Sequence, residues 1–464
     1  MKNSNENVSA SNAVPGFFTK DTGFYKTFFK MMIVVALQNL VAYSVNMADN
    51  IMLGSYSQNA LSGAATVNQI FFMVQQIALA IGNALVVLAS QYWGEKRIQP
   101  IRTLTGIALK LGIACSVVII ALCVCFPVQL LNLFTDSAPI IAEGQKYLTL
   151  VQWTFALFII TNILMAALRS VGIVQISFYI SVISLVINVG INYVLIFGCF
   201  GLPEMGVAGA AVGTLIARIV ELVIVVIYIL KFDKKLMLFK ENIFRPNRQL
   251  RHDYKNVVLP IMMSQVLWGV SVPMQTAILG HMSADAIAAN SVATTFYQYL
   301  KVIVIAMSST SAVMIGNAIG RGDMSRIKSD ARSLAVIDVL IGLVLGIILF
   351  LLRNPLLSMY DLSPEASVMA ANLIVIMSFI MVGMSYQMPV SFGIIQGGGD
   401  TGFTMKMNMI STWLIVMPLS FMAAFWWYWP VEAVVIVIQS DQIFKGLPTF
   451  IRFRSYKWIK KMTN

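Results

Sequence analysis

The sequence predicts an all-α polytopic membrane protein whose 12 transmembrane helices form two six-helix lobes. Three observations predict this fold: an apolar composition, twelve long apolar runs, and an internal repeat. Of the 464 residues, 58% are hydrophobic and 11% are charged, whereas soluble domains have about 25% charged residues. A chain of two or three soluble domains is therefore excluded.

Each predicted helix is an apolar run of about 20 residues, the length that crosses a ~30 Å hydrocarbon core. The runs are continuous and not alternating, which argues against a β-barrel. They cover residues 29–53, 64–91, 104–127, 145–168, 174–199, 206–230, 256–280, 288–317, 333–352, 367–395, 403–428 and 432–450.

Basic residues predict the orientation of these helices. They gather in every second connection, and the intervening loops contain only Lys146 and Arg353. This asymmetry places both termini in the cytoplasm and the chain in a cell membrane, plasma or inner. We therefore interpret the net charge of +12 as topology anchors at anionic membrane lipids and not as a nucleic-acid site.

The two halves repeat each other at an offset of 226 residues, where residues 53–94 align with 279–320 without a gap. Six helices per half is an even number, so the halves enter the membrane in the same orientation. They are then related by a pseudo-two-fold axis along the membrane normal. The expected organisation is a cytoplasmic segment (1–28), an N-terminal lobe (29–230), a basic cytoplasmic linker (231–255), a C-terminal lobe (256–450) and a basic cytoplasmic tail (451–464).

Ionisable residues inside membrane spans are costly and indicate function by default. Asp49 is the strongest candidate, because an acid in an apolar pocket can hold a proton near neutral pH or bind Na⁺. Oxygen-bearing side chains of spans 4 to 6 are candidates for the same site: Asn162, Asn188, Asn192 and Thr214. The alternatives are an Asp solvated at a helix end and asparagines that only join helices.

Other ionisable residues in the spans favour structural roles. Arg218 and Glu221 are three residues apart and predict an ion pair within one helix. Asp338 is expected to pair with basic residues of the preceding loop, and Lys110 to extend toward the membrane surface.

A cavity between the lobes is the expected substrate path. Adaptable Met and aromatic side chains with few polar groups favour amphipathic, often cationic, organic molecules. The candidate lining residues are Gln38, Asn46, Gln69, Gln265, Trp268, Gln275, Tyr299, Tyr386 and Gln387. Ordinary core or lipid-facing packing is the alternative for many of them.

Seven segments resemble the MATE (multidrug and toxic compound extrusion) family over residues 30–460, and most resemble its DinF-type branch. They are Met47–Gly54 (MADNIMLG), Ser90–Gly94 (SQYWG), Ala167–Gly172 (ALRSVG), Asn188–Gly198 (NVGINYVLIFG), Gly206–Ala211 (GVAGAA), Gln396–Thr401 (QGGGDT) and Arg452–Trp458 (RFRSYKW). The resemblance implies alternating access between two lobes. It also implies a cation site at Asp49, Asn188 and Thr214, with Asn162 nearby and Asn192 where some members have a second Asp.

The expected function is therefore an antiporter that exports drugs and toxic organic compounds, driven by H⁺ or Na⁺. We expect a monomer that handles small molecules, with no catalytic residues, no organic cofactor and no metal beyond Na⁺. A lipid-linked saccharide flippase is the alternative, although it needs several inward-facing basic residues. A membrane enzyme is disfavoured because His252 and His281 lie in loops on opposite faces.

Overall fold

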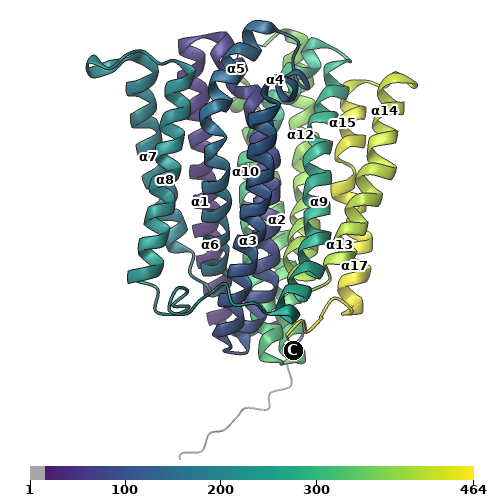
Figure 1. The fold of residues 1–464 in the computed structure, drawn as a ribbon. Coiled ribbons are helices and arrows are strands. Elements are labelled where there is room, and N and C mark those ends of the chain that lie inside the picture. The colour runs from purple at the N-terminus through teal and green to yellow at the C-terminus, as the bar shows by residue number, and fades with distance from the viewer. Residues whose placement is uncertain (1–15, 361, 464) are drawn as a thin grey trace, which may run out of the picture.

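The computed structural model describes residues 16–360 and 362–463, and these contain 12 helices long and apolar enough to cross a membrane. The predicted all-helical, multi-pass membrane fold is confirmed. The helices stand side by side, with α7 and α8 at one edge and α14 and α15 at the other, and the C-terminus lies at the lower face (Figure 1).

The first half of the chain forms six spans. Their helices are α1 (Thr22–Tyr56), α2 (Gln58–Gly94), α3 (Ile98–Cys125), α6 (Trp153–Ser170), α7 (Gln175–Phe197) and α8 (Val207–Lys231). Shorter helices α4 (Pro127–Asn132) and α5 (Ala138–Val151) and a 3-10 turn, η1 (Cys199–Gly201), lie in the connections.

The second half also forms six spans, three of them broken. They are α9 (Arg248–Gly280), α10 (Ala284–Arg321), α11 (Met324–Leu357), α12 (Pro364–Met388) with the π-helical segment η2 (Pro389–Ile395), α13 (Thr401–Asn408) with π-helical η3 (Met409–Val416) and α14 (Met417–Phe425), and finally α15 (Val431–Gln439), α16 (Asp441–Phe444) and α17 (Gly446–Ser455). The segment η2 begins at Pro389, which has no N–H to continue the α-helical hydrogen bonds.

The repeat is visible in helix caps and in helix packing. Ser57 and Ser283, which the offset of 226 aligns, each cap a helix by accepting a hydrogen bond from the amide three residues later. The repeat-related Gly94 and Gly320 meet where α2 crosses α10. A Cβ added at Gly94 would lie 2.9 Å from the Cα of Gly320, so glycine allows this close approach.

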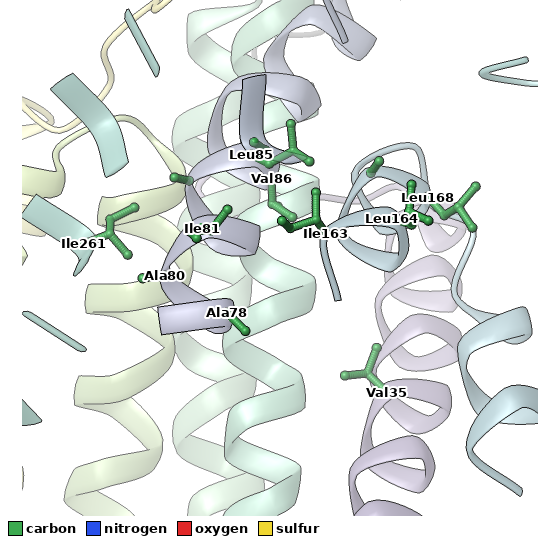
Figure 2. Close-up of a cluster of buried hydrophobic side chains, with 14 of the residues drawn as sticks. Val35, Ala78, Ala80, Ile81, Leu85, Val86, Ile163, Leu164, Leu168 and Ile261 are labelled. Atoms are coloured by element: carbon green, nitrogen blue, oxygen red, sulfur yellow. The ribbon is translucent and has the colours of Figure 1, made fainter. Parts of the chain in front are cut away.

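Small and branched side chains pack the centre of the molecule. Figure 2 shows Ala78, Ile81 and Leu85 of α2 among Ile163 and Leu164 of α6. Alanines on α2 let neighbouring helices approach closely, as is typical of membrane helix packing.

The helix ends differ from the predicted boundaries. Helix α1 begins at Thr22, and α9 begins at Arg248, so the second part of the predicted linker is helical. The Asn247 side chain caps α9 by accepting from the Leu250 amide at 2.9 Å. The remaining linker packs against α3, where Arg102 forms an ion pair with Glu241 at 2.9 Å.

Contacts between the two halves gather on the face where α2 and α10 end, which we call the basic face. Asp21, before α1, forms an ion pair with Arg326 of α11 at 2.6 Å. The C-terminal tail of the second half contacts the first half in turn: Lys461 forms an ion pair with Glu95, just after α2, at 2.9 Å. Each terminal segment therefore ties its own half to the other one.

Candidate functional site

Four of the predicted ion-site residues form one chain of hydrogen bonds across three helices. The Nδ2 of Asn192 donates to the Asp49 carboxylate at 2.6 Å and to Asn188 Oδ1 at 3.3 Å. The Nδ2 of Asn188 donates in turn to Thr214 Oγ1 at 3.3 Å. The structure thus joins α1, α7 and α8 through the polar side chains that the sequence selects.

Helical spacing and a glycine produce this arrangement. Asn188 and Asn192 are four residues apart, so they share one face of α7, and both are buried. Gly213 of α8 faces Asn192, and any Cβ there would collide with the amide oxygen. That oxygen has no hydrogen-bond partner among the described residues, so it is a free acceptor beside the chain.

Asp49 is partly buried, and Arg218 lies close enough to interact electrostatically with it. The carboxylate therefore has polar neighbours and is not simply solvated at a helix end. Asn162 lies on α6 and is half-buried. Among the described residues, no hydrogen bond joins its side chain to the hydrogen-bonded cluster of Asp49, Asn192, Asn188 and Thr214. The neighbouring Asn46 is exposed.

Arg218 is held in place by other groups. It forms the predicted ion pair with Glu221 at 2.7 Å, and its guanidinium lies 4.9 Å from the centre of the Phe158 ring. The ion pair and the aromatic contact explain why two charged residues occur in one span. Lys110 is exposed and donates to the Phe244 carbonyl at 3.2 Å.

The prediction for Asp338 was wrong. Its side chain is fully buried, and among the described residues neither carboxylate oxygen has a hydrogen-bond partner. Gly342, one turn along the same face of α11, contacts Ser385 of α12. The carboxyl therefore faces α12 and not the basic loop before α11.

A cavity of about 290 Å³ lies between the two halves. On α1 it is lined by Val35, Asn39 and Tyr43, whose spacing of four residues defines one helical face. The other lining side chains come from α2, α6, α9, α10 and the broken spans of the second half. The cavity therefore lies between the two halves, and its role as the substrate path stays a prediction.

Three of the predicted substrate residues, Gln265, Trp268 and Gln387, line this cavity. The others lie outside its lining: Gln38, Asn46, Gln69, Gln275, Tyr299 and Tyr386. Tyr299 instead contacts the sulfur of Met47, with 3.1 Å between its hydroxyl and Sδ.

Two kinds of displacement explain four of these outer positions. Gln38 and Tyr386 are neighbours in sequence of the lining residues Asn39 and Gln387, and one residue rotates a side chain by about 100° around a helix. Asn46 and Gln69 lie on lining faces of α1 and α2, but beyond the last residues that line the cavity.

Two basic lining residues were not predicted from the sequence. Arg169 lies just beyond the predicted span 145–168 and Lys445 lies within the predicted span 432–450, and both line the cavity together with Lys301. Lys445 is buried and forms an ion pair with Asp441 at 2.6 Å. The four-residue spacing of Asp441 and Lys445 was the signal that could have revealed this pair.

Comparison with known proteins places the chain among membrane transporters. The sequence model of the family described as MatE matches residues 35–194 and 260–422. The "Probable multidrug resistance protein NorM" of Thermotoga maritima is 25% identical over 440 residues, covering 94% of this chain and 93% of that one. The "Uncharacterized transporter YisQ" of Bacillus subtilis is 22% identical and covers 89% and 90%.

Solved structures share the fold. The Vibrio cholerae MATE transporter VcmN in its bent form has a TM-score of 0.82 at 18% identity, covering 93% of this chain and 97% of that one. A MOP superfamily transporter from Pyrococcus furiosus, described as having a binding pocket of reverse polarity that suggests a different function, has a TM-score of 0.85 at 16% identity. It covers 96% of this chain and all of that one.

Proposed function

Since the chain belongs to the MatE family, we propose that it is an ion-coupled antiporter that exports small amphipathic organic compounds by alternating access. Like its relatives it is a transport protein and not an enzyme. The observation that carries the proposal is the chain of hydrogen bonds from Asp49 through Asn192 and Asn188 to Thr214.

This chain is suited to binding one small cation. A proton entering the site would neutralise Asp49 and weaken its charge-assisted hydrogen bond with Asn192. A Na⁺ ion could instead take oxygen ligands from Asp49, Asn188 and Thr214, the residue types that hard cations prefer. Both H⁺ and Na⁺ therefore remain candidates for the coupling ion.

Helix α1 links the ion site to the cavity. It carries Asp49, and two to three turns away it carries the lining residues Asn39 and Tyr43. A shift of α1 on ion binding would therefore change the cavity wall directly. One charge crossing 100 mV supplies about 2.3 kcal/mol, enough for roughly a 50-fold gradient of a neutral substrate.

Packing at the basic face supports alternating access. Gly94 and Gly320 bring α2 and α10 together there, and the terminal segments add ion pairs between the halves. We assign this face to the cytoplasm of a plasma or inner membrane, because basic residues concentrate on it. The structure then corresponds to a state that is closed toward the cytoplasm.

The flippase alternative is less favoured, because curated relatives are named as multidrug resistance proteins. The acid in the first half and the neutral Gln275 at the repeat-related position fit the DinF-type branch that the sequence resembles. We expect the protein to act as a monomer in contact with membrane lipids, without nucleic acid.

The experiment is transport into inside-out vesicles with H⁺ and Na⁺ gradients imposed separately. Two dyes with the same xanthene ring serve as probes: anionic fluorescein and cationic tetramethylrhodamine methyl ester. We expect one gradient to drive uptake of at least one dye by the wild type, and Asp49→Asn to abolish that uptake at equal protein level.

Glu365→Gln is the matched control, because Glu365 is an exposed acid in the first turn of α12. It should transport like the wild type. If Asp49→Asn transports as well as this control, or if neither gradient drives either dye, the antiporter proposal is wrong.

A further inference from the structure

The charge of the central cavity is opposite to what an organic cation requires. Arg169, Lys301 and Lys445 line it, and no Asp or Glu lines it among the residues that the structure describes. Three basic groups attract an anionic ligand and repel a cationic one, most strongly where water is excluded.

Of the three basic lining residues, Lys301 is the most available to bind a ligand. It lies near the middle of α10, where its ammonium group sits 5.1 Å from the centre of the Trp268 ring. No hydrogen bond or ion pair to this ammonium group is formed by the described part of the chain. An ammonium group has three donors, so Lys301 can direct all of them at a ligand.

Lys445 is held rigidly beside the same space. Its ammonium group donates to Asp441 at 2.6 Å and to Asn408 Oδ1 at 3.0 Å. Asn408 is oriented in turn by donating to Ser264 at 2.6 Å. Two of the three donors of Lys445 are therefore used, and the third is free for a ligand.

The neighbouring charges do not cancel. Lys301 interacts electrostatically with both Asp441 and Lys445, so the three groups form one local cluster. Asp441 neutralises one of the two lysines, which leaves one positive charge before Arg169 is counted. A bound anion would offset the electrostatic repulsion between the ammonium groups of Lys301 and Lys445.

Arg169 provides a third basic group at the end of α6. Its Nε is shielded from solvent and has no hydrogen-bond partner among the described residues. No carboxylate of that part of the chain lies within ion-pair distance of its guanidinium. A half-buried guanidinium with a shielded Nε and no acid beside it can bind an anionic ligand, because its donors match carboxylate oxygens.

The rest of the lining suits an amphipathic molecule. Phe72, Trp268 and Phe392 provide an aromatic wall, whereas Gln265 and Gln442 provide neutral hydrogen-bonding groups.

Building on the antiporter proposed above, we propose that this cavity binds the anionic group of a free amphipathic organic acid, held between Lys301 and Lys445, and that such acids are the exported substrates. The often cationic substrates expected from the sequence do not suit this lining.

The membrane potential would favour this direction of transport. With a potential that is negative inside, each 100 mV supports about a 50-fold outward concentration gradient of a monovalent anion. The same potential opposes the export of a monovalent cation by the same factor. An entering H⁺ or Na⁺ and a departing anion therefore move charge in the same favourable direction.

Binding to the purified full-length protein tests this site without any ion gradient. The anisotropy of fluorescein is titrated with protein in an uncharged detergent, beside cationic tetramethylrhodamine methyl ester. We expect fluorescein to bind, and the cationic dye to bind at least about tenfold more weakly, because one hydrogen bond to a charged group changes affinity by that order.

Three variants locate the binding group. Lys301→Gln should weaken fluorescein binding about tenfold, and Lys301→Glu should also raise the affinity for the cationic dye. The double variant Asp441→Asn/Lys445→Gln removes both partners, so no buried charge is left unpaired, and it should weaken fluorescein binding. Lys110→Gln is the control, because Lys110 is exposed and lies outside the cavity lining.

Several results would overturn the proposal. One is stronger binding of the cationic dye than of fluorescein by the wild type, and another is unchanged fluorescein binding in Lys301→Gln with an unaltered melting temperature. If undecaprenyl pyrophosphate displaces fluorescein but naphthalene sulfonate does not, the ligand is a lipid pyrophosphate and not a free acid.

The outcomes also separate this site from the proposed function. Gradient-driven uptake of only the cationic dye would overturn the anion site and leave the antiporter intact. Fluorescein binding that depends on Lys301, without uptake under either gradient, would support the anion site and overturn the antiporter.

Discussion

At the scale of single residues, Asn192 is the centre of the polar cluster that we propose as the ion site. Its amide nitrogen donates to both Asp49 and Asn188, and its oxygen has no partner among the described residues. The nitrogen facing Asp49 stabilises a charged carboxylate but cannot ligate a cation. In this orientation the Asn192 nitrogen excludes itself as a Na⁺ ligand.

Replacing Asn192 with Asp should therefore create a Na⁺ site. The two side chains have nearly the same shape, so Asp fits beside Gly213, and two carboxylates then face each other across one small space. We expect Na⁺, but not K⁺, to raise the melting temperature of Asn192→Asp. A Na⁺ concentration of 100 times the Kd would raise the free energy of unfolding by about 2.7 kcal/mol.

Asn192→Leu is the matched control, because it also removes the amide but supplies no oxygen, and Na⁺ should not affect its melting temperature. Equal Na⁺ stabilisation of wild type and Asn192→Asp would contradict the prediction.

At the scale of helices, the crossing of α2 and α10 is the tight contact that we propose closes the basic face. Positions related by the repeat meet there: Gly94 lies against the Asn317 carbonyl, and Gly320 lies against the Gln91 carbonyl. The two halves contribute equivalent residues to this contact. Separating these two helix ends would therefore move both halves apart at the basic face.

A larger side chain at this crossing should open the basic face. Overpacking of a tight contact costs about 1–3 kcal/mol, so Gly320→Val should shift the population at least about fivefold toward the open state. The measurement is labelling of Ser308→Cys in the cavity with a membrane-impermeant maleimide from the basic face, after Cys115, Cys123, Cys125 and Cys199 are replaced.

Gly402→Val is the control, because a Cβ at Gly402 meets no atom within 4 Å. Its labelling rate should equal that of the Ser308→Cys parent. Unchanged labelling in Gly320→Val would show that the α2–α10 contact does not close the basic face.

At the scale of the whole molecule, periodicity and charge asymmetry were sufficient to predict the helices and their pairing into halves. The hydrogen-bonded cluster around Asp49 was predictable too, because Asn188 and Asn192 share one helical face and few ionisable residues occur in spans. The polarity of the cavity was not predictable. Arg169 and Lys445 lie at ends or breaks of spans, where a sequence does not show whether a basic residue faces water, lipid or the interior.

The terminal segments act on the same closure from outside the membrane spans. Burial alone would raise the pKa of Glu95, but hydrogen bonds from Thr463, Lys461 and Arg97 outweigh it and hold this pKa below its ordinary value of 4.5. The contribution of Glu95 to closure is therefore complete above pH 4.5 and is lost as the pH falls through the lowered pKa.

Hydrogen exchange of residues 456–463 should follow this titration. In the wild type, protection of these amides, corrected for the intrinsic pH dependence of exchange, should be constant near neutral pH and fall once the pH drops below 4.5. Glu95→Gln resembles the protonated carboxyl, so its tail should already exchange faster at neutral pH and show little further loss on acidification. Glu365→Gln, whose acid is far along the chain and exposed, should behave like the wild type. Equal protection of the tail in Glu95→Gln and wild type at neutral pH would mean that Glu95 does not hold the tail.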